Sequence, residues 1–210
     1  MSQDFNGSFP SQEVKTEGIK YGVYLGIIAL VLTIVSLYVL MNSADFKLSS
    51  MISGGVTIVI MIGLSAYFSI LLRRIAGGFW TFSQALKGIY VMLAIAVIIS
   101  GLGGAIFNLV DPEPQQIIFD KTINMTIETM EGLGVDEDII DSQVAELEQA
   151  RDTSRGFSIG QTLQSLAISL IMYFVFALVL AAILKRERPA FLNVPNTPDQ
   201  DADDIAQVNS

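Results

Sequence analysis

Several serines lie within the long uncharged stretches of this chain, and a serine inside a membrane can act as a nucleophile when a base activates it. They include Ser36, Ser65, Ser69, Ser100, Ser165 and Ser169. The stretches hold no charged residue and the chain has no His, so neither a base nor a pair of aspartates accompanies these serines. We therefore expect the hydroxyls to hydrogen-bond within or between helices, and we expect no catalytic residue and no enzyme.

Cofactor and metal chemistry also find little support in the sequence. The absence of Cys and His removes thiolate and imidazole ligands, and no glycine-rich phosphate loop is present. Asp199, Asp201 and Asp203 alternate like the start of an EF-hand loop. However, Asp204 replaces the glycine that such a loop requires, and Ser210 stands where the bidentate Glu belongs. We expect no bound metal and no cofactor.

The acidity of the chain is confined to one segment. Residues 111–156 contain twelve acidic and three basic residues, a net charge of −9 that equals the charge of the whole chain. A nucleic-acid partner is disfavoured, because binding phosphates needs a basic surface. The acids between Asp136 and Asp141 precede or begin a predicted helix, where they favour the macrodipole, and weak binding of Mg²⁺ or Ca²⁺ stays an alternative.

Four uncharged stretches dominate the rest of the chain, which is 51% hydrophobic with a mean hydropathy of +0.54. They cover about 21–41, 51–72, 88–110 and 163–184. As helices each would reach about 31 to 35 Å, enough to cross a hydrocarbon core of roughly 30 Å. The sequence therefore predicts an all-α membrane protein with four transmembrane helices, of which the first stays as an anchor because it is too long for a cleaved signal.

Polar segments flank and interrupt these spans. Residues 1–17 and 192–210 are expected to be flexible tails around a membrane domain over 18–191. Between the third and fourth spans, apolar residues recur at helical spacing over 115–131 and again over 137–150. This pattern predicts an amphipathic helical hairpin over 111–156, with Asp111 as the N-cap and Pro112 as the first helical residue.

Small residues in the spans indicate close helix packing. Gly18, Gly22 and Gly26 share one face of the first span, and Ala177 and Ala181 do so in the fourth.

Three further glycines, Gly101, Gly103 and Gly104, lie in the third span and weaken a helix by about 1 kcal/mol each. We interpret them as a packing groove. The alternative is a broken helix of the kind found in transporters.

Basic residues predict the orientation. Eight of them fall on the side of the termini: Lys15, Lys20, Arg73, Arg74, Lys87, Lys185, Arg186 and Arg188. Four fall on the other side: Lys47, Lys121, Arg151 and Arg155. By the positive-inside rule both termini are cytoplasmic and the hairpin is extracytoplasmic.

Three sequence motifs together resemble a bacterial membrane family catalogued as domain of unknown function 4199. They are GGFWTFSQALKGIY before the third span, NLVDP at its end and ILKRERPAF after the fourth, with the amphipathic hairpin between them. The resemblance runs from roughly Lys15 to Phe191. The matching positions are Gly78, Phe79, Trp80, Phe82, Asp111, Pro112, Pro189 and Phe191. The resemblance implies a four-helix protein of the bacterial inner membrane and brings no activity with it.

Two kinds of function fit these features. We expect an interaction or assembly protein that sits in the lipid bilayer and contacts an envelope protein through residues 111–156, while Gly and Ala faces would also allow a homo-oligomer. The alternative is a small oligomeric transporter or channel, whose pathway would lie at Ser100–Gly104 and Asn108.

Overall fold

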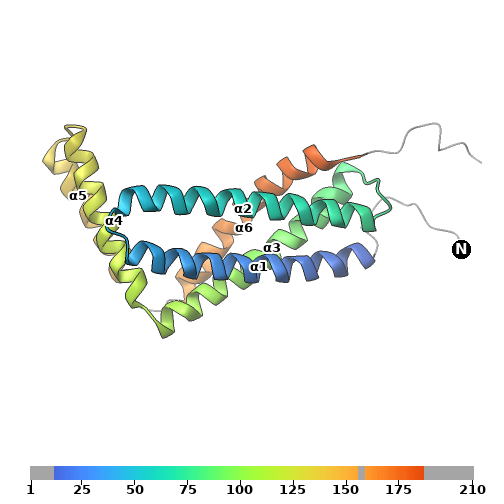
Figure 1. Ribbon diagram of the computed structural model, residues 1–210, viewed down its shortest axis with the longest axis horizontal. Coiled ribbons are helices and arrows are strands. Elements are labelled where there is room, and N and C mark those ends of the chain that lie inside the picture. The colour runs from blue at the N-terminus through green and yellow to red at the C-terminus, as the bar shows by residue number, and fades with distance from the viewer. Residues whose placement is uncertain (1–11, 156–158, 187–210) are drawn as a thin grey trace, which may run out of the picture.

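The computed structural model describes residues 12–155 and 159–186, which are helical apart from short connections (Figure 1). The helices are α1 (Gln12–Met41), α2 (Phe46–Ile75), α3 (Phe82–Val110), α4 (Glu113–Gly132), α5 (Glu137–Arg155) and α6 (Ile159–Leu184). Helices α1, α2, α3 and α6 are long and apolar enough to cross a membrane. The predicted fold class of four spans, with a helical hairpin between the third and fourth, is confirmed.

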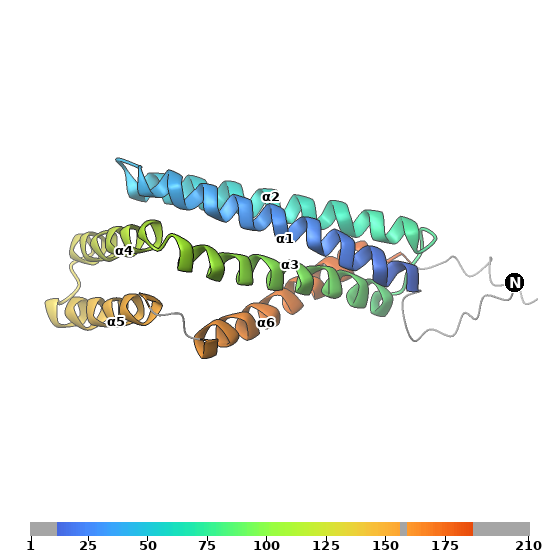
Figure 2. The ribbon, with the colours of Figure 1, turned by 90° about the horizontal axis from the view of Figure 1, so that it is seen from below.

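The four spans form a bundle in which α1 and α3 share the longest contact. Helix α2 lies beside α1 and also contacts α3 and α6, and α6 packs against α3 (Figures 1 and 2). The hairpin of α4 and α5 lies at the end of the bundle opposite the start of α1 (Figure 1). Helix α4 contacts α1 and α2, so the hairpin is packed onto the bundle.

The buried core lies towards the end of the bundle where α1 begins. Leu25, Leu72, Ile89, Met92 and Leu93 are fully buried there, and they join α1, α2 and α3 in one cluster. Towards the hairpin, most large apolar side chains of the spans face outward instead. That outward surface suits the acyl chains of a bilayer, which solvate apolar side chains as well as a core does.

Helix α1 begins earlier than the sequence indicates. Residues 12–17, expected to belong to the N-terminal tail, form its first turns, and the Thr16 hydroxyl donates to the Gln12 carbonyl at 3.0 Å. Val14 is only 2% exposed because it packs at Gly88 of α3. A polar stretch with one buried residue carries too weak a pattern to predict that contact. Residues 1–11 and the expected tail over 192–210 lie outside the described residues.

Candidate functional site

The α1–α3 contact depends on two of the predicted packing glycines. A Cβ atom on Gly22 would lie 2.6 Å from the Met92 carbonyl oxygen, and one on Gly26 would lie 2.9 Å from that of Ala96. Gly18 has more room, with its nearest neighbour at 3.6 Å. The backbones of α1 and α3 therefore approach so closely at Gly22 and Gly26 that a side chain does not fit.

Helix α3 is unbroken through the glycines that could have interrupted it. Two of them contact neighbouring helices: a Cβ on Gly101 would meet Leu166 of α6 at 2.6 Å, and one on Gly103 would meet Leu30 of α1 at 2.5 Å. No atom lies within 4 Å of the Gly104 Cβ position. Packing, not a break, therefore explains Gly101 and Gly103, and the structure gives no packing role to Gly104.

The motif before α3 forms a clamp onto the end of α6. Gly77 and Gly78 adopt left-handed φ angles of 89° and 82°, and the Gly78 N–H closes α2 by donating to the Arg73 carbonyl at 2.9 Å. This turn directs Trp80 inward, where it is 2% exposed. The indole N–H donates to the Leu184 carbonyl at 3.0 Å. Trp80 thereby fixes the α2–α3 loop to the last turn of α6.

Backbone and ring contacts complete this clamp. Trp80 and Arg186 exchange two backbone hydrogen bonds of 3.0 and 3.2 Å, and the Arg186 guanidinium lies 5.4 Å from the centre of the Phe79 ring. Thr81 and Gln84 then start α3 with a reciprocal capping box. Phe82 follows as the first residue of α3 and is 38% exposed. Pro189 and Phe191 lie outside the described residues.

At the opposite end of the bundle, Asp111 connects α3 to α1. Its carboxylate accepts a hydrogen bond of 2.6 Å from the Tyr38 hydroxyl. Both predictions for the start of α4 are wrong: Asp111 is the C-cap of α3, and Pro112 is the N-cap of α4, without a side-chain bond, where it was expected to be the first helical residue. The carboxylate bonds to Tyr38 of α1, and Pro112 separates Asp111 from the first residue of α4. Asp111 thus fixes the position from which the hairpin starts.

Lys121 of α4 holds the hairpin against the end of α1. Its ammonium group donates to the carbonyls of Leu40, Met41 and Ser43 at 3.1, 2.8 and 2.9 Å. It also lies 5.9 Å from the centre of the Phe46 ring at the start of α2. The last carbonyls of a helix lack partners within it and carry partial negative charge, so a lysine satisfies them well. From the sequence, Lys121 was placed only on the side of the hairpin, with no contact predicted for it.

Within the hairpin, α4 and α5 pack against each other through a small apolar interface. Ile123 of α4 and Ile140 of α5 are buried, and Arg151 of α5 forms an ion pair with Asp120 of α4. Gly134, with a φ of 71°, makes the turn after α4. Asp136 directly precedes α5, and its carbonyl accepts from the N–H groups of residues 139 and 140. Helices α4 and α5 are thereby held as one unit.

The outer surface of the hairpin combines acids with two apolar side chains. Asp136, Glu137, Asp138 and Asp141 are all exposed around the start of α5. Leu133 in the turn is 76% exposed. Ile139, one of the apolar residues at helical spacing over 137–150, is 52% exposed, because the side chain of the next residue, Ile140, takes the inward position. Among the residues that the structure describes, no group of three or more acids has the geometry of a metal site.

The comparison with protein families found one family model that covers most of the chain. The family model described as Protein of unknown function (DUF4199) matches residues 20–186. The chain belongs to this family. The DUF4199 match includes the clamp, the close α1–α3 contact at Gly22 and Gly26, and the hairpin, whereas Gly18, Pro189 and Phe191 fall outside it. No curated protein and no solved structure matches the chain.

Replacing Lys121 with Met should loosen the hairpin from the bundle. The change keeps an unbranched side chain of similar length but removes the three hydrogen bonds of the ammonium group. We expect it to weaken the docking of α4 by about 2 kcal/mol. Hydrogen exchange of the protein in lipid nanodiscs measures this, with amides of α4 expected to exchange at least roughly tenfold faster. Lys47, which is exposed in the first turn of α2, provides the matched control. Equal exchange in both variants would show that Lys121 does not anchor the hairpin.

Proposed function

We propose that this DUF4199 protein is a non-enzymatic interaction or assembly protein of the bacterial inner membrane. Its hairpin binds an extracytoplasmic protein that carries a basic surface. The observation that carries the proposal is the group of exposed acids at the start of α5: Asp136, Glu137, Asp138 and Asp141 have no ion-pair partner among the described residues.

Charge repulsion is the first argument for a basic partner. Acids that crowd one helix end repel one another, and basic side chains placed opposite them would relieve that repulsion. The attraction would act over about a Debye length, roughly 8 Å at physiological salt, and would mainly speed the encounter and select the partner. Binding of this kind weakens as the salt concentration rises.

Apolar contacts supply the second argument. Leu133 and Ile139 are exposed beside the acids. Interfaces usually bury a few large apolar side chains at their centre and surround them with polar groups. The hairpin has this composition on its outer surface.

The anchoring of the hairpin favours presentation to a partner. Lys121 and Asp111 connect it to α1. A surface that is already ordered loses less conformational entropy on binding than a free segment would.

The orientation follows from the distribution of basic residues. Arg73, Arg74, Lys87, Lys185 and Arg186 lie at the end of the bundle where α1 begins, and the hairpin lies at the other end. The positive-inside rule then places the hairpin outside the cytoplasm.

Removing the four charges tests the proposal. The variant Asp136→Asn, Glu137→Gln, Asp138→Asn, Asp141→Asn keeps the size of each side chain. We expect purification in mild detergent to recover at least about tenfold less of a specific partner whose binding surface is basic, and we expect high salt to reduce its recovery from wild type.

A matched control neutralises four acids of the C-terminal tail: Asp199→Asn, Asp201→Asn, Asp203→Asn, Asp204→Asn. It should leave recovery unchanged. If the hairpin variant recovered the same proteins in the same amounts as wild type, binding through these acids would be ruled out.

A further inference from the structure

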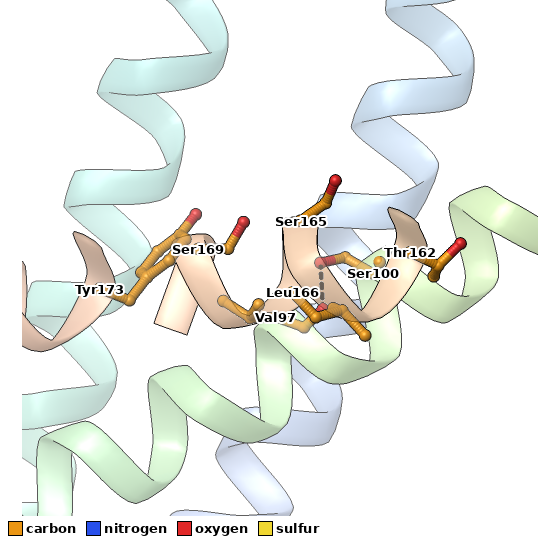
Figure 3. A pocket seen from close by; sticks show the side chains of 8 residues that line it. Val97, Ser100, Thr162, Ser165, Leu166, Ser169 and Tyr173 are labelled. Atoms are coloured by element: carbon orange, nitrogen blue, oxygen red, sulfur yellow. Dashed lines mark hydrogen bonds between the residues drawn. The ribbon is translucent and has the colours of Figure 1, made fainter. Parts of the chain in front are cut away.

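A pocket of about 230 Å³ lies between α3 and α6 (Figure 3). Its most distinctive feature is the set of hydroxyl groups around it, which belong to Ser100, Thr162, Ser165, Ser169 and Tyr173. Val97 and Leu166 provide apolar walls. None of the residues that the structure places around this pocket is charged.

The pocket exists because α3 and α6 separate towards the hairpin. Near the other end, Ala177 and Ala181 of α6 are fully buried in the core cluster, so the two helices lie close together there. Further along, α6 diverges from α3 (Figure 2). Within this gap, the side chain of Leu166 of α6 packs against Gly101 of α3. The pocket lies beside the contact between Leu166 and Gly101, about 15 Å before the end of α3.

The hydroxyls of α6 share one face of the helix. Thr162, Ser165, Ser169 and Tyr173 follow one another at intervals of three and four residues, the spacing that aligns side chains along a helix. In Figure 3 the oxygens of Ser165, Ser169 and Tyr173 point to the same side of α6. The face is therefore a row of polar groups at membrane depth.

Four of these five hydroxyls have no partner among the residues that the structure describes. Ser100 donates to the Val97 carbonyl at 3.3 Å, but the four hydroxyls of α6 make no hydrogen bond to any described residue. Elsewhere in the spans, Thr33 and Ser69 donate to carbonyls one turn earlier at 2.9 and 2.6 Å. A hydroxyl left unbonded in an apolar medium costs free energy, so a ligand that accepts these hydrogen bonds is favoured there.

We propose that this pocket binds the neutral, oxygen-bearing head of a membrane-soluble lipid, a carbonyl, ester or hydroxyl group carried on an apolar body. A charged head would have no counter-charge in the pocket and would lose its hydration. The volume is below the 300–1,000 Å³ typical of sites that enclose a whole drug-sized ligand, so only the head enters and the apolar body stays in the bilayer. An isoprenoid quinone and a diacylglycerol both present this chemistry.

Photolabelling in nanodiscs tests the site with three probes of defined chemistry. The first is a photoreactive naphthoquinone with an isoprenoid tail, the second a diazirine diacylglycerol, and the third a diazirine phosphatidylglycerol as the charged comparison. We expect a neutral probe to label the peptide that contains residues 162–173 at least about fivefold more than the charged probe. Whether the quinone or the diacylglycerol gives that labelling identifies the source of the head group.

The dependence on the hydroxyls is tested with Thr162→Val, Ser165→Ala, Ser169→Ala. With three donors removed, labelling should fall by about tenfold or more. The matched control Thr33→Val, Ser53→Ala, Ser69→Ala removes three hydroxyls outside the pocket and should label like wild type. If the triple variant does not elute as a folded protein, single Ser165→Ala, whose side chain is exposed, replaces it. Equal labelling by charged and neutral probes, no labelling, or labelling that survives loss of the hydroxyls would each overturn the proposal.

Discussion

Replacing Trp80 with Ala should lower the free energy of unfolding by about 3–5 kcal/mol, the usual cost of truncating a fully buried Trp. Trp80 is 2% exposed, belongs to the core cluster and donates its indole N–H to Leu184. Its loss would open a cavity between Gly88 and α6 and would leave a carbonyl without its donor. Denaturant titration in detergent micelles, followed by circular dichroism, measures the change.

Two further variants separate packing from hydrogen bonding at this position. Trp80→Phe keeps most of the ring but removes the donor, so it should cost less than the Ala variant. Phe82→Ala truncates an aromatic residue of the same loop region that is 38% exposed, and it should also have a clearly smaller effect than Trp80→Ala. Similar losses for Trp80→Ala and Phe82→Ala would contradict the role of Trp80 as the centre of the clamp.

Replacing Gly22 with Ala should be almost as disruptive, although it adds a single methyl group. That methyl would lie 2.6 Å from the Met92 carbonyl oxygen and 2.8 Å from the Ile95 Cβ atom. Neither atom is the end of a flexible side chain, so α1 and α3 must move apart. We expect a loss of about 2–3 kcal/mol, near the upper end for an overpacked site, and weaker crosslinking between cysteines introduced on the two helices.

Gly63 of α2 provides the matched control, because no atom lies within 4 Å of its Cβ position. Gly63→Ala should be neutral or stabilising by up to about 1 kcal/mol through helix propensity. The prediction for Gly22 fails if the two Gly→Ala variants unfold at the same denaturant concentration.

The four spans and the hairpin could be predicted from sequence because each depends on local composition. An uncharged run of more than twenty residues has few alternatives to a transmembrane helix. The glycines at positions 22 and 26 were also recognisable, since their spacing places them on one helical face. The partner helix was not predictable, because no local pattern shows that α1 packs against α3 and not only against its neighbour α2.

Contacts between distant residues account for what the sequence did not reveal. Asp111 looked like an N-cap because Asp and Pro often begin helices, but its partner Tyr38 lies 73 residues away. Lys121 entered the sequence-based predictions only as one charge in the orientation count. One signal could have identified it: Lys121 lies three and four residues after Ile118 and Ile117, on the apolar face of α4. A lysine on such a face needs acceptors nearby, and the end of α1 provides them.

The serines around the pocket are a further case in which contacts between distant residues could not be predicted from the sequence. Ser100, Ser165 and Ser169 were expected to bond within or between helices, and Ser100 does so. The hydroxyls of Ser165 and Ser169 have no partner in the described residues, and they lie where α6 diverges from α3 and leaves no acceptor of that helix within reach. That divergence follows from how the two helices cross, which residue spacing within one helix does not determine.

Photocrosslinking from the outer surface of the hairpin tests most directly whether the protein acts through contacts there. A photoreactive phenylalanine analogue would replace Leu133 or Ile139, which are exposed, and in control proteins Ile123 or Ile140, which are buried within the hairpin. In living cells we expect the two exposed positions to capture the same extracytoplasmic protein at a basic surface, and the buried positions not to capture it. Capture at background level from Leu133 and Ile139, or equal capture from all four positions, would contradict an interaction through this surface.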